Sequence, residues 1–308
     1  MLPDRQDMTS LNEAMEQQEL KGRSPWADAR KRFFHNKAGV IGLLILILIA
    51  AFAFLGGHFA KFDNDEIDFM VIGQVAELGG PSLENGHYFG TDDLGRDLFA
   101  RVVQGTQVSL MVGIVSAAIA VIVGTLYGAT AGYMGGRIDN IMMRTVDIFM
   151  SIPYMFVLIL MLVMFGRSIY LLFAGIGVLS WLEMSRVVRG QTLSLKGKEF
   201  IEAAQAIGVP GYKIVLRHIV PNLLGVVVVY ATLLVPLMIL TESFISFLGL
   251  GVQEPNTSWG ALIAEGAGTM RYGTIWQLAI PLFFFIITLF AFYFVGDGLR
   301  DALDPKER

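Results

Sequence analysis

Six uncharged, predominantly apolar runs constrain this chain more than any other feature of its sequence. They cover residues 38–57, 102–136, 148–166, 168–182, 219–241 and 272–296. A helix needs about 20 apolar residues to cross the hydrocarbon core of a bilayer, and the short fourth run reaches that length if its helix continues to about Val188. Only 16% of the 308 residues are charged, against about 25% in soluble domains. The sequence therefore predicts an all-α membrane protein with six transmembrane helices.

Charged residues and one proline mark details of these helices. Pro153 lies inside the third run and predicts a kink there. Glu183 and Arg186 would extend the fourth helix, and their i,i+3 spacing allows them to pair. Arg144 and Asp147, where the third helix begins, have the same spacing and are also expected to pair.

Lys and Arg residues gather in alternate segments between the runs. They concentrate in the N-terminal tail, at 137–144, at 186–217 and in the C-terminal tail. Because basic residues are retained on the cytoplasmic side, both termini are predicted to be cytoplasmic. The first 37 residues are polar and charged, so the run at 38–57 is interpreted as a retained anchor rather than as part of a cleaved signal peptide.

Composition argues against several classes of function. The chain has no cysteine, which excludes disulfides and thiolate metal sites, and its net charge of −4 argues against nucleic acid as a partner. It contains neither a phosphate-binding Gly-x-x-x-x-Gly-Lys-Ser/Thr loop nor a His-Glu-x-x-His motif. Gly296-Asp297 resembles part of the Gly-x-Gly-Asp motif of membrane aspartyl proteases, but Phe294 stands where the first glycine is required. We therefore predict no catalytic residues, no metal and no cofactor.

Two features inside the runs can be interpreted either as packing contacts or as parts of the transport machinery. Gly124, Gly128 and Gly132 form a smooth stripe that predicts close helix packing, near a moving interface or simply within the bundle. Glu242 lies in the fifth helix, where a charge costs about 2.5–3.5 kcal/mol on insertion scales. It should therefore face protein or water, either along a translocation path or against a partner subunit.

The cytoplasmic segment 195–221 carries the most specific pattern. An apolar stripe is formed at i, i+3, i+4 and i+7 by Phe200, Ala203, Ala204 and Ile207. Gly208 then ends this short helix, and Pro210 follows two residues later. Periodicity alone leaves two alternatives for the stripe: a cleft in another protein, or the lipid headgroups.

The same segment resembles the EAA loop of ABC importer permeases. The shared pattern is Glu202-Ala203-Ala204, three residues, Gly208, and a proline thirteen residues later at 221, although His218 and Val220 depart from the family pattern. Residues 87–110, 251–266 and 296–305 resemble further segments of peptide permeases, especially the C-type subunit of oligopeptide importers, with the dipeptide importer next.

The resemblance implies a type I ABC importer permease fold in the bacterial cytoplasmic membrane. Glu202, Ala203, Ala204 and Gly208, with Phe200 and Ile207, would couple the chain to two separate ATPase subunits. A second homologous permease, making a heterodimer, would enclose the translocation path together with this chain, and both would be surrounded by membrane lipid. An external peptide-binding protein would deliver the oligopeptides or dipeptides that are imported. The expected organisation begins with a cytoplasmic tail (1–37), a first helix (38–57) and an external loop (58–104). A transmembrane domain (105–297) that contains the coupling loop 195–218 follows, and a second cytoplasmic tail (298–308) ends the chain.

Two rival functions remain open at this point. A proton-coupled secondary transporter would use Glu183 or Glu242 as its titrating group, but it would leave the 195–211 loop without a purpose. A permease of the same fold could instead carry nickel or another solute.

Overall fold

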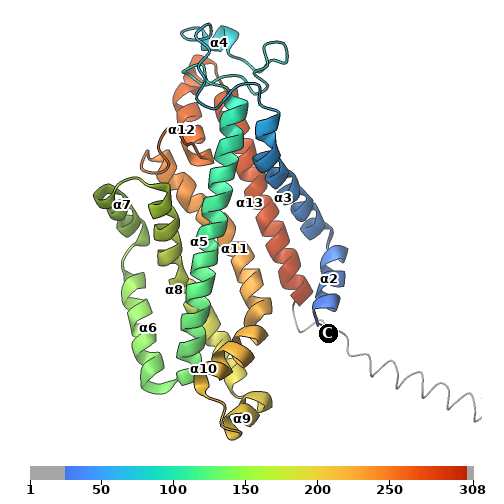
Figure 1. The fold of residues 1–308 in the computed structure, drawn as a ribbon, viewed down its shortest axis with the longest axis vertical. Helices are drawn as coiled ribbons and strands as arrows, with labels where there is room; N and C mark the ends of the chain where they lie inside the picture. Colours follow the sequence, from blue (N-terminus) through green and yellow to red (C-terminus); the bar gives the residue numbers. More distant parts are fainter. Residues whose placement is uncertain (1–24, 304–308) are drawn as a thin grey trace, which may run out of the picture.

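The computed structural model describes residues 25–303, and every named element in that range is helical. An elongated bundle is built around α5 (Leu98–Met134), which runs along most of its length (Figure 1). A long loop with the short helix α4 (Val75–Leu78) covers one end. The opposite end carries α9 (Glu199–Ala206) and α10 (Gly211–Ile214). The two ends of the bundle are therefore built from different parts of the chain.

Five helical segments are long and apolar enough to cross a membrane on their own. A sixth span is formed if the bent pair α6 (Gly136–Ser151) and α7 (Tyr154–Phe165) is counted as one. The first three of the five are Lys37–His58, which contains α3 (Lys37–Leu55) and the turn η1 (Gly56–His58), Leu98–Met134, which is α5, and Ile169–Lys196, which is α8. The fourth is Gly211–Phe247, which contains α10, the π-helical turn η2 (Val215–Ile219) and α11 (Val220–Phe247). The fifth is Trp276–Leu303, which is α13. With the bent pair, these spans match the six that were predicted.

The third span differs most from its prediction. Its helix begins at Gly136, well before the uncharged run, because only a short glycine turn separates it from α5: Gly135 and Gly136 have φ angles of 65° and 56°. The predicted kink is confirmed as a break, since α6 and α7 meet at 74° around Ile152 and Pro153. Pro153 cannot donate a backbone hydrogen bond to the preceding turn, which explains where the break falls.

The glycine stripe lies between α5 and α8 (Ile169–Lys196). A Cβ at Gly124 would lie 2.6 Å from Cβ of Met184, and one at Gly132 would lie 2.8 Å from Cβ of Thr192. A Cβ at Gly128 would overlap the carbonyl oxygen of Ser185. The stripe therefore serves close packing of two helices within this chain.

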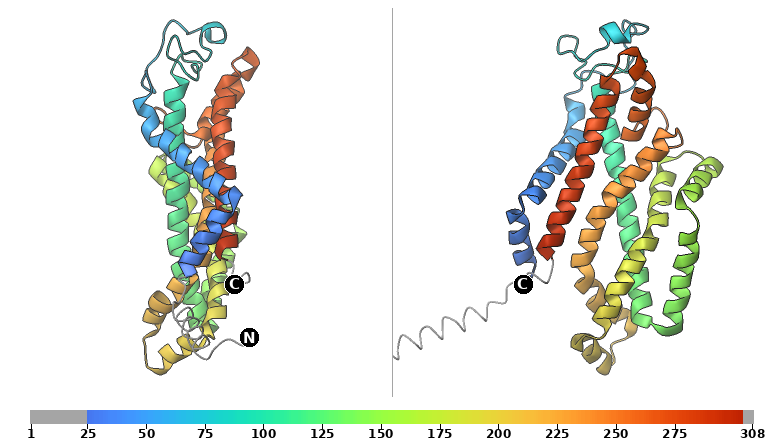
Figure 2. Two further views of the ribbon diagram at one scale, coloured as in Figure 1. Left: turned by 90° about the vertical axis from the view of Figure 1, so that its right-hand side faces the viewer. Right: turned by 180° about the vertical axis from the view of Figure 1, so that it is seen from behind.

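The first and last helices form one edge of the bundle, and α6 and α7 form the opposite edge (Figure 2). The N-terminal helix α2 (Pro25–His35) buries Phe33 against Gly39 and Gly298, where α3 and α13 approach closely. Asn36 caps α3 by accepting from the Gly39 amide at 3.0 Å. The beginning of the predicted N-terminal tail, 1–24, and the end of the C-terminal tail, 304–308, lie outside the described residues.

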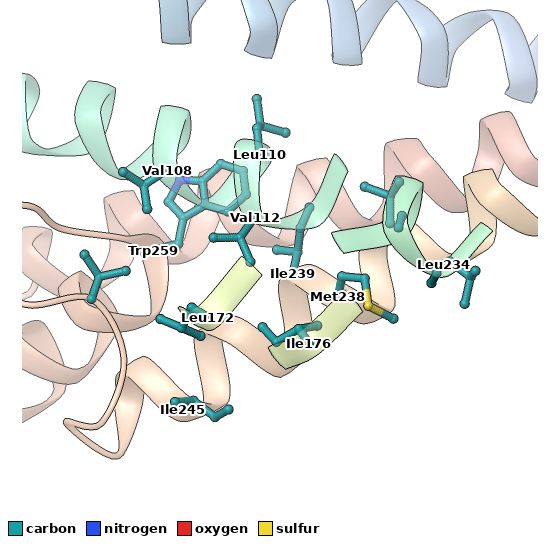
Figure 3. Packing of buried hydrophobic residues seen from close by; sticks show 14 of the residues in the cluster. Val108, Leu110, Val112, Leu172, Ile176, Leu234, Met238, Ile239, Ile245 and Trp259 are labelled. Carbon is teal, nitrogen blue, oxygen red and sulfur yellow. The ribbon is translucent and has the colours of Figure 1, made fainter. Parts of the chain in front are cut away.

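The main core lies among α5, α8, α11 and the short helix α12 (Trp259–Thr269), which the turn η3 (Met270–Tyr272) separates from α13. Figure 3 shows Trp259 inserted between apolar side chains of these helices. Its ring is fully buried, and its Nε1 donates to Thr106 Oγ1 at 3.1 Å. A satisfied indole is what a buried tryptophan requires, so α12 is fixed firmly against α5.

Candidate functional site

Helix α9 is attached to the bundle by a small part of its surface. Ile201 is fully buried and Ala204 nearly so, and both belong to a cluster that includes Ile214 and Ile219 of the helix that follows. Sequence periodicity did not single out Ile201, because it lies off the predicted stripe. Its burial shows that one face of α9 is held by this chain, which leaves the other face available.

The exposed face of α9 carries the rest of the predicted stripe. Phe200 is 42% exposed and Ile207 81% exposed, and Ala203 between them is also exposed. Ala204 is separated from these three because it turns toward the bundle. Glu202 is exposed on the outward surface of the helix. We name Phe200, Ala203 and Ile207 the α9 ridge.

A left-handed glycine ends α9 and fixes the turn into α10. Gly208 has φ +78°, and its amide donates to the carbonyl of Gln205 at 3.0 Å. The Val209 amide donates to the carbonyl of Ala204, also at 3.0 Å. This pair of bonds is the Schellman arrangement, which requires a residue able to adopt positive φ. The ridge is therefore presented by a short helix with a defined end.

Cross-helix ion pairs replace the local pairs that spacing predicted. Arg186 of α8 pairs with Asp147 of α6, so the expected pairs Arg144–Asp147 and Glu183–Arg186 are both wrong. One turn further along, Arg189 donates to both oxygens of Asp139, at 2.7 and 2.6 Å. These contacts join α6 and α8, and neither could be recognised from i,i+3 spacing.

Glu183 lines a pocket of 310 Å³ beside the break between α6 and α7. Its side chain is exposed, and among residues 25–303 it has no ion-pair partner. The pocket also receives residues from α6, α7 and α11, including Tyr154 and Thr241, whose hydroxyls are 3.2 Å apart.

Glu242 is enclosed by this chain. Its side chain has no exposed surface, and it accepts from Ser246 at 2.6 Å, from Ser109 at 3.1 Å and from Ser243 at 3.3 Å. Ser109 Oγ also accepts from the Trp259 amide at 3.1 Å. The carboxyl group thus joins α5, α11 and α12, and the side chain faces protein, as the cost of a charge in lipid requires.

A second polar network fastens to the bundle the long loop that carries α4, residues 59–97, which we name the α4 loop. The buried side chain of Arg101 contacts Asp92 and donates to both oxygens of Glu265, at 2.8 and 3.1 Å. Arg96 donates to Asp92 at 2.6 Å and to Glu254 at 2.7 Å. The segment 91–101 is in this way tied to the loop that precedes α12 and to α12 itself.

His87 connects the beginning of the α4 loop to its end, through contacts with Phe62 and Asp97. The Asp97 carboxylate caps α5 by accepting from the Ala100 amide at 2.8 Å, and it lies 2.9 Å from Nδ1 of His87. The His87 ring is buried and stacks on Phe62. Burial raises the pKa of the Asp97 carboxyl, and its hydrogen bonds only partly oppose that rise.

Comparison with known proteins gives the family. Residues 124–308 match the family described as "Binding-protein-dependent transport system inner membrane component", and residues 24–74 match the "N-terminal TM domain of oligopeptide transport permease C". The chain is 54% identical to the oligopeptide transport system permease protein OppC of Escherichia coli K12 over 308 residues, all of both chains.

Two further relatives are more distant. The corresponding OppC protein of Haemophilus influenzae is 51% identical over 294 residues, 96% of this chain and 93% of that one. The dipeptide transport system permease protein DppC of Bacillus subtilis is 40% identical over 281 residues, 91% and 86% of the two chains. These matches cover the helical bundle and the α9 segment alike. The chain therefore belongs to the family of binding-protein-dependent transport system inner membrane components, as a multi-pass permease subunit of an ABC importer with the type I fold.

Proposed function

We propose that this chain is the C-type permease of an importer for oligopeptides, driven by ATP hydrolysed on separate subunits. A relative named as an oligopeptide permease is 54% identical over the whole chain, and this supports oligopeptides as the substrate class. A second, homologous permease would complete the path as a heterodimer, and an external binding protein would deliver the peptide.

The single observation that carries the coupling role is the α9 ridge. Phe200 and Ile207 expose large apolar surfaces at the end of the bundle that also carries the basic loop around α9 and α10. Exposed apolar residues on a short, firmly ended helix suit a groove in another protein. We propose that the ridge enters a groove on an ATPase subunit, with Ala203 allowing close approach and Glu202 at its margin. Ala204 would hold the helix against the bundle, and Gly208 would end it.

The distribution of charge along the chain supports a topology. The α9 end carries many Lys and Arg residues, whereas the long loop at the other end is acidic. We propose that α9 and both termini face the cytoplasm. We also propose that the chain consists of a cytoplasmic tail (1–37), a first transmembrane helix (38–57), an external loop (58–104), a transmembrane domain (105–297) and a second cytoplasmic tail (298–308). Part of the first tail is folded as α2.

Glu242 and the glycine stripe are proposed to serve packing. Both lie at contacts within the chain, and Glu242 has no exposed surface from which to reach a path or a partner. This weakens the proton-coupled alternative for Glu242, because a titrating group must be reached by water.

The test is uptake of a labelled tripeptide by cells with and without this gene. One condition depletes ATP and keeps the proton gradient, and the other collapses the gradient and keeps ATP. We expect uptake that requires the gene and ATP and survives loss of the gradient. Uptake that follows the gradient would refute the ABC mechanism, and uptake unaffected by deletion would refute the substrate class, with nickel uptake measured next.

A further inference from the structure

The break between α6 and α7 creates a place suited to a positive charge. The last carbonyl groups of a helix lack intrahelical amide partners. At the end of α6 the Ser151 hydroxyl and the Ile152 amide donate to the carbonyls of Ile148 and Phe149, but Pro153 has no amide hydrogen to donate to the carbonyls that follow. The C-terminal end of a helix carries a partial negative charge. Broken membrane helices use such ends to hold cations. The residues at this break line the 310 Å³ pocket.

Glu183 adds a full negative charge to the same pocket. It lies midway along α8, exposed, and within residues 25–303 it has no cation within pairing distance. Arg186, the nearest basic residue along the helix, is engaged by Asp147. An ionisable group inside a membrane-spanning helix is costly unless it faces water or a counter-charge, so an unpaired carboxylate indicates a site that something else completes.

The other lining residues select the kind of cation. Met150, Leu182 and Met238 make much of the wall apolar, while Tyr154 and Thr241 offer hydroxyl oxygens. Residues 25–303 contain no cluster of three side chains able to hold a metal ion. One carboxylate, hydroxyl acceptors and an apolar wall of this volume fit an organic ammonium group better than a bare ion.

We propose that Glu183 receives the N-terminal ammonium group of a peptide in transit, in a pocket between the α6–α7 break and α11. This inference rests on the proposed function, since it assumes that the cargo is a peptide. Linear peptides with a free N-terminus carry this ammonium group whatever their sequence. A contact to it therefore lets one path accept many sequences while still recognising the peptide end.

The absence of cysteine makes a direct test available. In the assembled transporter, reconstituted without its binding protein, Ser180→Cys places a unique thiol of this chain in the same pocket. The rate at which a water-soluble methanethiosulfonate reagent modifies this thiol is followed by mass spectrometry of the chain. A free-amine tripeptide and its N-acetylated form are titrated as protecting ligands, with Glu183 and with Glu183→Gln. Leu83→Cys, exposed in the loop that carries α4 and outside the pocket lining, is the control.

We expect the free-amine peptide to protect Ser180→Cys at about tenfold lower concentration than the acetylated peptide, as a charge-assisted hydrogen bond would give. Glu183→Gln should abolish that difference, and Leu83→Cys should be modified at a rate that does not depend on either peptide. Equal protection by the two peptides with Glu183 present, or none by either, would overturn the inference. If the wild-type complex still imports tripeptide in that case, the inference alone fails. If it imports none, the proposed function fails as well.

Discussion

Arg101 donates two hydrogen bonds to Glu265 of α12, at 2.8 and 3.1 Å, and also contacts Asp92 of the α4 loop. Arg101 is only 3% exposed and Asp92 7%, whereas Glu265 is 41% exposed. The three residues come from three separate elements. The arginine is therefore the centre of the connection between the loop and the bundle.

Arg101→Met should lower the free energy of unfolding by about 3 kcal/mol, because it leaves the buried Asp92 carboxylate with one cation fewer. Glu265→Gln is the matched control, and it should cost about 1 kcal/mol or less because that carboxylate is partly solvated. The free energy of unfolding in detergent micelles is the measurement. Equal losses in the two variants would contradict the central role of Arg101.

Gly128→Ala should cost about 2–3 kcal/mol of stability, because the new methyl group would overlap the backbone of Ser185 and force α5 and α8 apart. Gly190→Ala, in α8, has nothing within 4 Å of its new carbon. It should leave stability unchanged or raise it by up to about 1 kcal/mol, as a helical glycine-to-alanine change does. Thermal unfolding of the two variants separates packing from propensity, and an equal loss at both positions would show that overlap with Ser185 is not what destabilises Gly128→Ala.

Most of the helices could be predicted from apolar runs, and the contacts between them could not. The fourth run ends at Leu182, yet α8 continues to Lys196 because Arg186 and Arg189 find carboxylates on α6. Arg189 and Asp139 are 50 residues apart, so no local spacing reveals them. At the candidate site, periodicity found the exposed ridge but not Ile201, whose burial depends on where the bundle lies. Sequence patterns report on single helices, whereas partners depend on how helices meet.

The buried Asp97 carboxyl should make stability depend on pH in an acidic window. Its pKa is raised in the folded state above the usual 3.8, so the folded protein binds the proton more tightly than the unfolded chain does. Stability should therefore fall as pH rises from about 3.8 through the folded pKa.

Asp97→Asn is the matched variant for that prediction, because asparagine caps helices as well as aspartate does but does not titrate. The difference in unfolding free energy between wild type and Asp97→Asn should shrink or reverse as pH rises through the window. A difference that stays constant with pH would show that Asp97 is not the titrating group.

Gly208→Val should weaken association with the ATPase subunits. Gly208 has φ +78° with nothing within 4 Å of an added Cβ, so the cost is backbone strain, about 1–2 kcal/mol and more for a β-branched residue. Gly197→Val is the control, since Gly197 is equally open but has φ −88°. Co-purification of the ATPases should fall for the first variant and not for the second, and Gly208→Asn should retain most of it.

Ile207 should contribute to docking without contributing to folding. Its side chain is 81% exposed, so Ile207→Ser removes little buried surface and should leave the unfolding temperature unchanged. If the α9 ridge enters a groove, the same change should cost about 2 kcal/mol or more of binding, which weakens ATPase association more than tenfold. The matched control is Leu83→Ser, which removes an aliphatic side chain of similar size, 84% exposed, from the α4 loop. Loss of peptide-stimulated ATP hydrolysis in Ile207→Ser, with normal values in Leu83→Ser, is the expected result. Equal activity in both variants would mean that the ridge rests on lipid headgroups, because a single polar substitution in a bilayer-facing helix leaves the ATPase contacts intact.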